Sequence, residues 1–435
     1  MPIRRSLPRC LPSCFAVLQA AFPAVVIAVV LSATTVAQEV APSDVPPSSA
    51  VPSDQLPDEP SAEEAAASAG QALAPPPPLT AAEQQLADHF DAQRAQWVET
   101  LTQMRAIQIR YSNGVERSEE NLQQYGELRD RGRIELRELY DRAEAMFEAR
   151  RDHFDAASLL ATVLDYRMGN SIYEDSYQAA KMLLEAEVTL PFLYIMAARA
   201  AFLEGQFDEV VPYYQTFVDE HGADKLEPID HRLSSIIDVY RPWWEEELER
   251  RAAEADDLPR VLLETTRGPV VIELFEDAAP NTVANFIQLV ESGFYDGHDF
   301  YQVIDDLLAM TGDPHGDGSG TSGRYIPDEH DRPERRRIFR GSVFMAKVPV
   351  APDSSDFVPN TASSQFVIAL MPILPKELSQ TVFGRVIEGM DVIGSFQRVD
   401  PQEKKEDQIQ LPPDRIVTAR VLRKRDHDYS VTYTR

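Results

Sequence analysis

The hydrophobic periodicity of the chain changes once, near residue 258, and this change most strongly constrains the fold. Before it, from about Thr80 to Glu254, apolar residues recur at helical spacing and glycines are few. After it, alternating apolar runs are separated by glycine and proline loops, beginning with RVLLETTRGPVVIELF. The sequence therefore predicts an all-helical domain, residues 80–254, followed by a mainly antiparallel β-barrel domain, residues 258–428.

The helical domain carries one start signal and one repeat-like stretch. Thr80 and Glu83 have the spacing of a capping box, which marks the beginning of a helix. Further along, small, glycine and aromatic residues lie near the positions where a tetratricopeptide repeat uses them. These residues are Tyr194, Ala198, Gly205, Tyr214 and Phe217. A degenerate earlier copy is LLATVLDYRMGNSIYEDSYQAAKMLLEA. Two weak copies fall short of the roughly three repeats that a solenoid needs, so a plain helical bundle is an equal alternative to a TPR-like domain.

The N-terminal segment has the features of an export signal. Arg4, Arg5 and Arg9 precede the apolar stretch FAVLQAAFPAVVIAVVL, and small residues follow it, so cleavage after residue 37 is expected. Residues 38–79, rich in Pro, Ala, Ser and acidic residues, are predicted to form a disordered linker. The alternative is an uncleaved anchor, because the apolar stretch is near the lower length limit of a membrane span. We therefore expect an exported, periplasmic or cell-envelope protein, either released or anchored by this segment.

Charge and reactive side chains exclude several classes of function. The chain has 71 acidic and 42 basic residues, for a net charge of -29, so nucleic acid and anionic membranes are not expected as partners. Membrane contact is expected only if the N-terminal segment stays uncleaved. Cys10 and Cys14 both lie in that segment, so the mature chain would have no disulfide and no cysteine metal site. The histidines at 298, 315 and 330 show no metal or zincin spacing.

A glycine-rich loop, residues 311–323, raises a separate question about ligands. A phosphate loop would lead directly into a helix, but the residues that follow are not an apolar helix and contain no Gly-Lys-Ser/Thr. A calcium loop would use Asp313, Asp317 and Ser319, but the acidic closing residue and the flanking helices are missing. We therefore expect no cofactor and no metal, and interpret the loop as a flexible rim around a pocket.

Several C-terminal segments, in order, resemble the cyclophilin family of peptidyl-prolyl cis-trans isomerases. They span about Leu258 to Arg425 and read TTRGPVVIELFEDAAPNTVANFIQLVESGFYDGHDFYQVI, TGDPHGDGSGTSG, IPDEH, RGSVFMAK, NTASSQFVIAL and QTVFGRVIEGMDVI. The resemblance implies a closed eight-stranded barrel with two helices, and it makes the glycine loop the rim of a peptide groove. The best-retained positions build the barrel: Phe286, Phe300, Gly312, Asp313, Met345, Phe366, Phe383 and Gly384.

The same resemblance assigns the candidate site residues. The family's histidine and catalytic arginine fall on Tyr301 and Gln302, and its glutamine is retained as Gln365. Gln302 and Gln365 are therefore the catalytic candidates, although Gln302 lacks the charge that strengthens a hydrogen bond. Most substrate-binding positions also depart from the residue usual in the family. These candidates are Phe300, Leu307, Leu308, Met310, Ala346, Lys347, Val367 and Gln380.

Two functions are compatible with these residues. The first is a weak prolyl isomerase acting on exported polypeptides, which would lower a rotation barrier of roughly 18–20 kcal/mol by binding the twisted X-Pro bond more tightly than either planar isomer. The second is a catalytically inactive peptide-binding or scaffold module, whose helical domain binds a protein partner. In both cases the expected ligands are Pro-containing polypeptide segments. The fold alone does not choose between them.

Overall fold

The computed structural model describes residues 77–112, 118–351, 354, 356–373, 379–400 and 412–434. The predicted signal segment and nearly all of the predicted linker lie outside the described residues. Within the described ranges, no helix is both long and apolar enough to cross a membrane.

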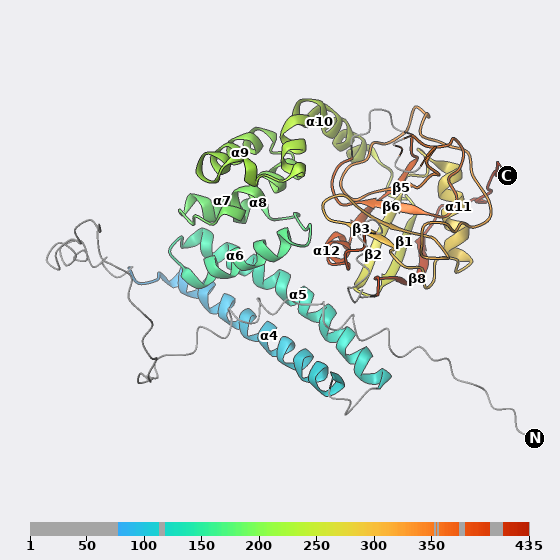
Figure 1. Cartoon of the computed structure of the whole chain (residues 1–435). Coiled ribbons are helices and arrows are strands. Elements are labelled where there is room, and N and C mark those ends of the chain that lie inside the picture. The colour runs from blue at the N-terminus through green and yellow to red at the C-terminus, as the bar shows by residue number, and fades with distance from the viewer. Residues whose placement is uncertain are drawn as a thin grey trace, which may run out of the picture.

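The first part of the described chain is helical (Figure 1). Its elements are α4 (Ala81–Ser112), α5 (Glu119–Ala149), α6 (Phe154–Met168), α7 (Tyr177–Glu185), α8 (Pro191–Leu203), α9 (Phe207–His221), the short 3-10 helix η2 (Ala223–Lys225) and α10 (Pro228–Ala253). At its start, the Thr80 N–H donates to Glu83 Oε2 at 2.7 Å and the Glu83 N–H donates to Thr80 Oγ1 at 3.3 Å. The predicted capping box is confirmed.

The repeat-like stretch forms the antiparallel pair α8 and α9. Gly205, in the turn between them, has a φ of +80°, a conformation that favours glycine. Ala198, Tyr214 and Phe217 are buried in the core of the helical domain. The packing of α8 and α9 in this core explains why the stretch has small and aromatic residues at these positions. The tetratricopeptide interpretation stays a prediction.

The second part forms one antiparallel sheet of eight strands in the order β3-β4-β6-β5-β7-β2-β1-β8. The strands are β1 (Arg260–Thr265), β2 (Gly268–Leu274), β3 (Gln302–Ile304), β4 (Leu308–Thr311), β5 (Ser342–Met345), β6 (Phe366–Ala369), β7 (Val382–Glu388) and β8 (Ile416–Arg423). Two helices accompany them, α11 (Pro280–Glu291) and α12 (Met390–Gly394). The apolar face of α11, formed by Val283, Phe286, Ile287 and Val290, is buried in the core of this domain.

The prediction of a closed barrel is wrong, because the sheet has two free ends, β3 and β8. The chain before β3 meets β8 at one corner, through an isolated bridge between Asp299 and Arg415. β3 begins only after this corner and has three residues, so it pairs with β4 alone among the named strands. The sheet is therefore an open half-barrel.

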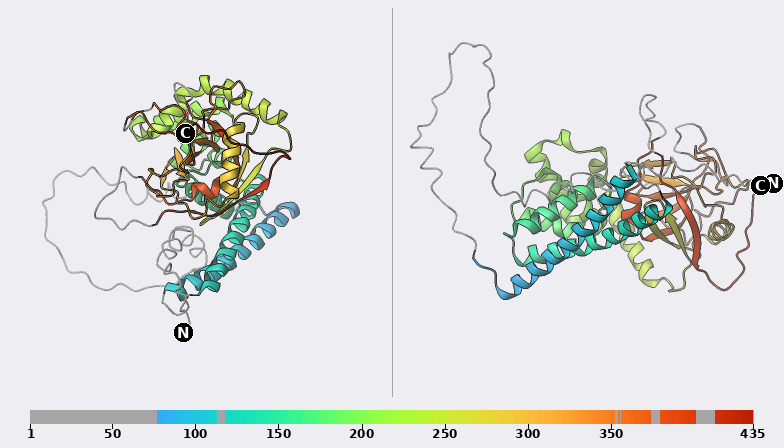
Figure 2. Two further views of the ribbon diagram at one scale, coloured as in Figure 1. Left: turned by 90° about the vertical axis from the view of Figure 1, so that its right-hand side faces the viewer. Right: turned by 90° about the horizontal axis from the view of Figure 1, so that it is seen from below.

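The helical and barrel domains adjoin in all three views of the molecule (Figures 1 and 2). Phe339 and Met371, from the barrel domain, are 2% and 0% exposed and belong to the core of the helical domain. The Phe339 ring lies 5.6 Å from that of Tyr240 and 5.3 Å from that of Trp244, between ring centroids. Because the two domains share apolar side chains, neither buries its own core completely alone.

Candidate functional site

The register of four neighbouring strands places one row of side chains across the sheet. Gln302 of β3 lies opposite Met310 of β4, and Met310 lies opposite Val367 of β6. Val367 in turn lies opposite Phe344 of β5. Successive side chains of a strand point to opposite faces, and the interior face is occupied by the alternate residues Val303, Ala309, Phe366 and Val343.

The row continues into an apolar surface that we call the outer patch. Its buried floor consists of Phe275, Ala278, Ile338, Phe344, Val367, Ala369 and Val382. Its partly exposed members are Leu308, Met310, Ala346 and Ile373. Four residues predicted to bind substrate, Leu308, Met310, Ala346 and Val367, are thus brought together. An apolar surface of this kind can receive a proline ring.

Gln302 stands at the edge of the outer patch, opposite Met310. It is half-buried, and its carboxamide makes no hydrogen bond among the described residues. Its N–H groups are therefore available to a bound peptide. The other catalytic candidate is arranged differently.

The carboxamide of Gln365 is used within the protein. The Tyr301 hydroxyl donates to Gln365 Oε1 at 2.6 Å. Gln365 Nε2 donates to the carbonyl oxygens of Gly318 at 3.0 Å and Gly320 at 2.7 Å, both in the glycine loop. Burial, together with the nearby acidic Asp313, raises the pKa of Tyr301. Tyr301 therefore stays protonated and acts as the donor, and Gln365 holds the glycine loop in place.

The bond between Tyr301 and Gln365 gives a testable effect on stability. We expect Tyr301→Phe to lower the free energy of unfolding by about 0.5–1.5 kcal/mol, because a mostly buried hydrogen bond is lost. Urea denaturation measures this change. Tyr325→Phe is the matched control, because the Tyr325 hydroxyl makes no hydrogen bond among the described residues. Equal stabilities of the two variants would contradict the assignment.

The glycine loop is organised by Asp313, which is 1% exposed. Its carboxylate accepts from the backbone N–H of His315 at 2.8 Å, of Asp317 at 3.0 Å and of Gly318 at 2.5 Å. The side chains of Asp313, His315 and Asp317 could in geometry hold a metal ion, since their ligand atoms lie within 4.8 Å of one another. Three amides of the loop itself already donate to the Asp313 carboxylate, and these hydrogen bonds hold the loop in its described conformation.

Lys347 is buried in a polar network beside the outer patch. Its Nζ donates to Asp328 Oδ2 at 2.6 Å and to the Ser379 carbonyl at 3.0 Å. The same Asp328 oxygen accepts from the Asn360 N–H at 2.9 Å. The ammonium therefore connects three loops beside the outer patch and is not free to bind a ligand. Gln380 is half-buried and accepts from Ser379 Oγ at 3.3 Å.

The two remaining substrate-binding candidates lie away from the centre of the outer patch. Phe300 is fully buried in the interior core, where its ring centroid lies 4.4 Å from that of Phe396. Leu307 is half-buried in the turn between β3 and β4, and its carbonyl accepts from the Leu370 N–H at 3.0 Å. Phe300 can support the strand from behind, whereas Leu307 lies in the turn next to Leu308 of the outer patch.

Comparison with known proteins identifies the family of the C-terminal domain. The family described as cyclophilin type peptidyl-prolyl cis-trans isomerase/CLD matches residues 260–421. Peptidyl-prolyl cis-trans isomerase-like 1 of Mus musculus is 32% identical over 155 residues, which cover 35% of this chain and 89% of that protein. Its counterpart from Neurospora crassa is 34% identical over 168 residues, which cover 38% of this chain and 96% of that protein. This chain belongs to the cyclophilin family.

Other relatives share the cyclophilin domain in other contexts. Peptidyl-prolyl cis-trans isomerase cyp15 of Rhizopus delemar is 36% identical over 152 residues, which cover 34% of this chain and 23% of that protein. A solved cyclophilin type isomerase of Cryptosporidium parvum is 27% identical, with a TM-score of 0.32, and the match covers 39% of this chain and 99% of that one.

Sequence reasoning missed seven of the eleven members of the outer patch of the cyclophilin domain, among them Phe344 and Ile373. Phe344 could have been found, because it alternates with the interior residues Val343 and Met345 along β5. Ile373 lies in a loop, where no periodicity indicates the direction of a side chain.

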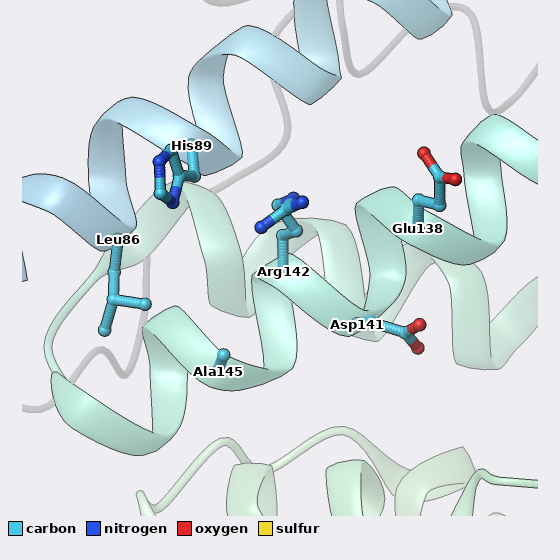
Figure 3. A pocket seen from close by; sticks show the side chains of 6 residues that line it. All are labelled: Leu86, His89, Glu138, Asp141, Arg142 and Ala145. Carbon is cyan, nitrogen blue, oxygen red and sulfur yellow. The ribbon is translucent and has the colours of Figure 1, made fainter.

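A separate surface hollow lies on the helical domain, between α4 and α5 (Figure 3). It has a volume of about 250 Å³ and is lined by Leu86, His89, Glu138, Asp141, Arg142 and Ala145. No residue predicted for the peptide site lines it. Its side chains offer charges but no pairing of a nucleophile with a base.

Proposed function

We propose that this protein is a peptidyl-prolyl cis-trans isomerase of low activity that acts on proline-containing segments of exported polypeptides. Family membership supports the reaction class. The observation that carries the proposal is the free carboxamide of Gln302 beside the outer patch. The export of the protein is inferred from the N-terminal sequence alone.

The proposed mechanism needs only binding and one directed hydrogen bond. The outer patch would hold the proline ring, while Gln302 donates to the prolyl nitrogen as amide resonance is lost and its lone pair is freed. Such a donor stabilises the twisted state more than either planar isomer, which is the condition for catalysis. Because the carboxamide is neutral, its hydrogen bond is weaker than that of a guanidinium. The proposed rate is therefore low.

The alternative, an inactive peptide-binding module, is favoured by a specific observation. The polar groups of Gln365 and Lys347 are already satisfied by Gly318, Gly320 and Asp328. A peptide would therefore meet few free donors besides Gln302. In this alternative, the helical domain would bring the peptide site to a protein partner.

The relaxation of a cis-enriched proline tetrapeptide, with and without the full chain, tests the proposal. We expect relaxation faster than the uncatalysed rate, and a return to the uncatalysed rate in Gln302→Met, which keeps the size of the side chain but removes its donor. Peptide resonances that shift without faster relaxation would support the binding module instead. A peptide that neither binds nor isomerises faster would contradict both functions.

A further inference from the structure

The helical domain contacts the turn that joins β3 to β4. The Leu307 N–H donates to the Ile304 carbonyl at 3.2 Å, which closes the turn, and Asp306 has a φ of +49°. Three groups of the helical domain bind Asp306. Its N–H donates to Ser171 Oγ at 3.2 Å, and its carboxylate accepts from the Tyr173 hydroxyl at 2.7 Å. The third is the guanidinium of Arg199, whose Nη1 donates to Asp306 Oδ2 at 2.7 Å.

The Arg199 side chain is also held in place within the helical domain, by Asp230. It is 3% exposed on α8, and its Nε and Nη2 donate to the two oxygens of Asp230 at 2.7 and 3.0 Å. Asp230 is 1% exposed and also accepts from the Tyr214 hydroxyl at 3.0 Å. This paired geometry fixes the plane of the guanidinium, so Nη1 points to Asp306 with little freedom.

A second charge of the helical domain acts on the same turn without contacting it. Arg232 of α10 interacts electrostatically with Asp306, and its Nε and Nη2 are buried without a hydrogen-bond partner. The carboxylate of Asp306 thus lies near two guanidinium groups of the helical domain, those of Arg199 and Arg232.

Residues 171–174 of the helical domain, which bind Asp306, are also linked to the end of β6 through Arg340. Arg340 of the barrel domain donates to the Ser171 carbonyl at 2.8 Å and to Glu174 Oε1 at 2.6 Å. It also donates to the Leu370 carbonyl, and the Leu370 N–H binds Leu307. Residues 171–174 of the helical domain therefore bind the turn after β3 directly and are linked through Arg340 to Leu370, the residue that follows β6.

We propose that residues 171–174 and Arg199 of the helical domain are positioning elements that fix the β3–β4 hairpin. The hairpin carries Gln302 and the Leu308 and Met310 side of the outer patch, so this inference rests on the proposed function in assigning the hairpin to peptide binding. β3 is a three-residue strand at the edge of the sheet. A short edge strand is the part of a sheet that opens most easily, so its position depends most on outside support.

We call the contacts of residues 171–174 and Arg199 with the β3–β4 hairpin the clamp. Hydrogen–deuterium exchange on the full chain tests it. Asp306→Gly keeps a residue that tolerates positive φ and removes the whole side chain, including the carboxylate that the helical domain binds. We expect the amides of residues 302–311 to exchange about tenfold faster, as befits the loss of charge-assisted hydrogen bonds, while β1 and β2 are unchanged. The KM for a proline tetrapeptide is expected to rise several-fold, with a smaller change in kcat, because the groove is misplaced rather than its donor removed.

Arg129→Ala is the matched control. Arg129 Nη1 donates to the Thr266 carbonyl at 2.7 Å, so this variant also loses a bond between the domains, but at the β1–β2 turn. It should leave hairpin exchange unchanged. Tyr173→Phe removes one bond from Asp306 and should give a smaller increase than Asp306→Gly. Unchanged hairpin exchange in Asp306→Gly, or an equal increase throughout the chain, would overturn the proposal. Faster hairpin exchange in a protein that binds no proline peptide would support the clamp while contradicting the proposed function.

Discussion

Gln302→Arg is expected to raise kcat/KM for a proline tetrapeptide by about 30- to 1000-fold. A charged donor directed at developing electron density contributes about 2–4 kcal/mol of transition-state stabilisation. The side chain has room to act, because the carboxamide of Gln302 has no partner among the described residues and its neighbour across the ladder is the flexible Met310. Steady-state kinetics of the full chain measure the change.

Gln302→Lys is the control for this gain of activity. It supplies a charge but lacks the planar, delocalised guanidinium, so we expect it to gain much less than the arginine variant. A folded Gln302→Arg protein no more active than the wild type would show that the outer patch has changed in shape as well as in its donor. The isomerase proposal would then yield to the binding module.

Arg199→Met should have the largest effect on stability. The substitution leaves the carboxylate of Asp230, 1% exposed, without its ion pair. Breaking a buried pair from one side costs about 3–5 kcal/mol, because the remaining charge stays out of water. Three further contacts disappear, those with Asp306, Tyr173 and Glu227. Chemical denaturation of the full chain, followed by circular dichroism, measures the loss.

Arg241→Met provides the comparison for Arg199. Arg241 pairs with Asp208 on the exposed surface of the same domain, where water screens an ion pair and leaves it a small contribution to stability. Adding Asp230→Asn to Arg199→Met should recover part of the stability, because it removes the unpaired charge. Equal losses in the two single variants, or no recovery in the double variant, would contradict a buried network.

Much of the fold could be predicted because hydrophobic periodicity is local. The change near residue 258, the capping box at Thr80 and the apolar face of α11 all depend on neighbouring residues. The open sheet could not be predicted this way, because closure depends on where β3 begins relative to β8. The core shared by the two domains could not be predicted either. Phe339 and Met371 lie in loops, where no hydrophobic periodicity indicates which residues they contact.

The sequence predicted where the candidate site residues lie, but it did not predict which of their side chains are free to bind a ligand. Resemblance to the family located Leu308, Met310 and Val367, which do share one surface. It could not show that Gln365 is held by Tyr301, because whether a side chain is free depends on loops distant in sequence. The contact between Asp306 and the helical domain has no sequence signal, since its partners lie more than a hundred residues earlier.

The most direct test of the central claim is nuclear magnetic resonance of the full chain with an Ala-Pro tetrapeptide. One sample reports both the exchange between cis and trans peptide resonances and the contacts of the proline ring. The account predicts exchange faster than in free peptide, with contacts from the ring to the side chains of Leu308, Met310 and Val367. Exchange at the free-peptide rate, or ring contacts away from the outer patch, would contradict it.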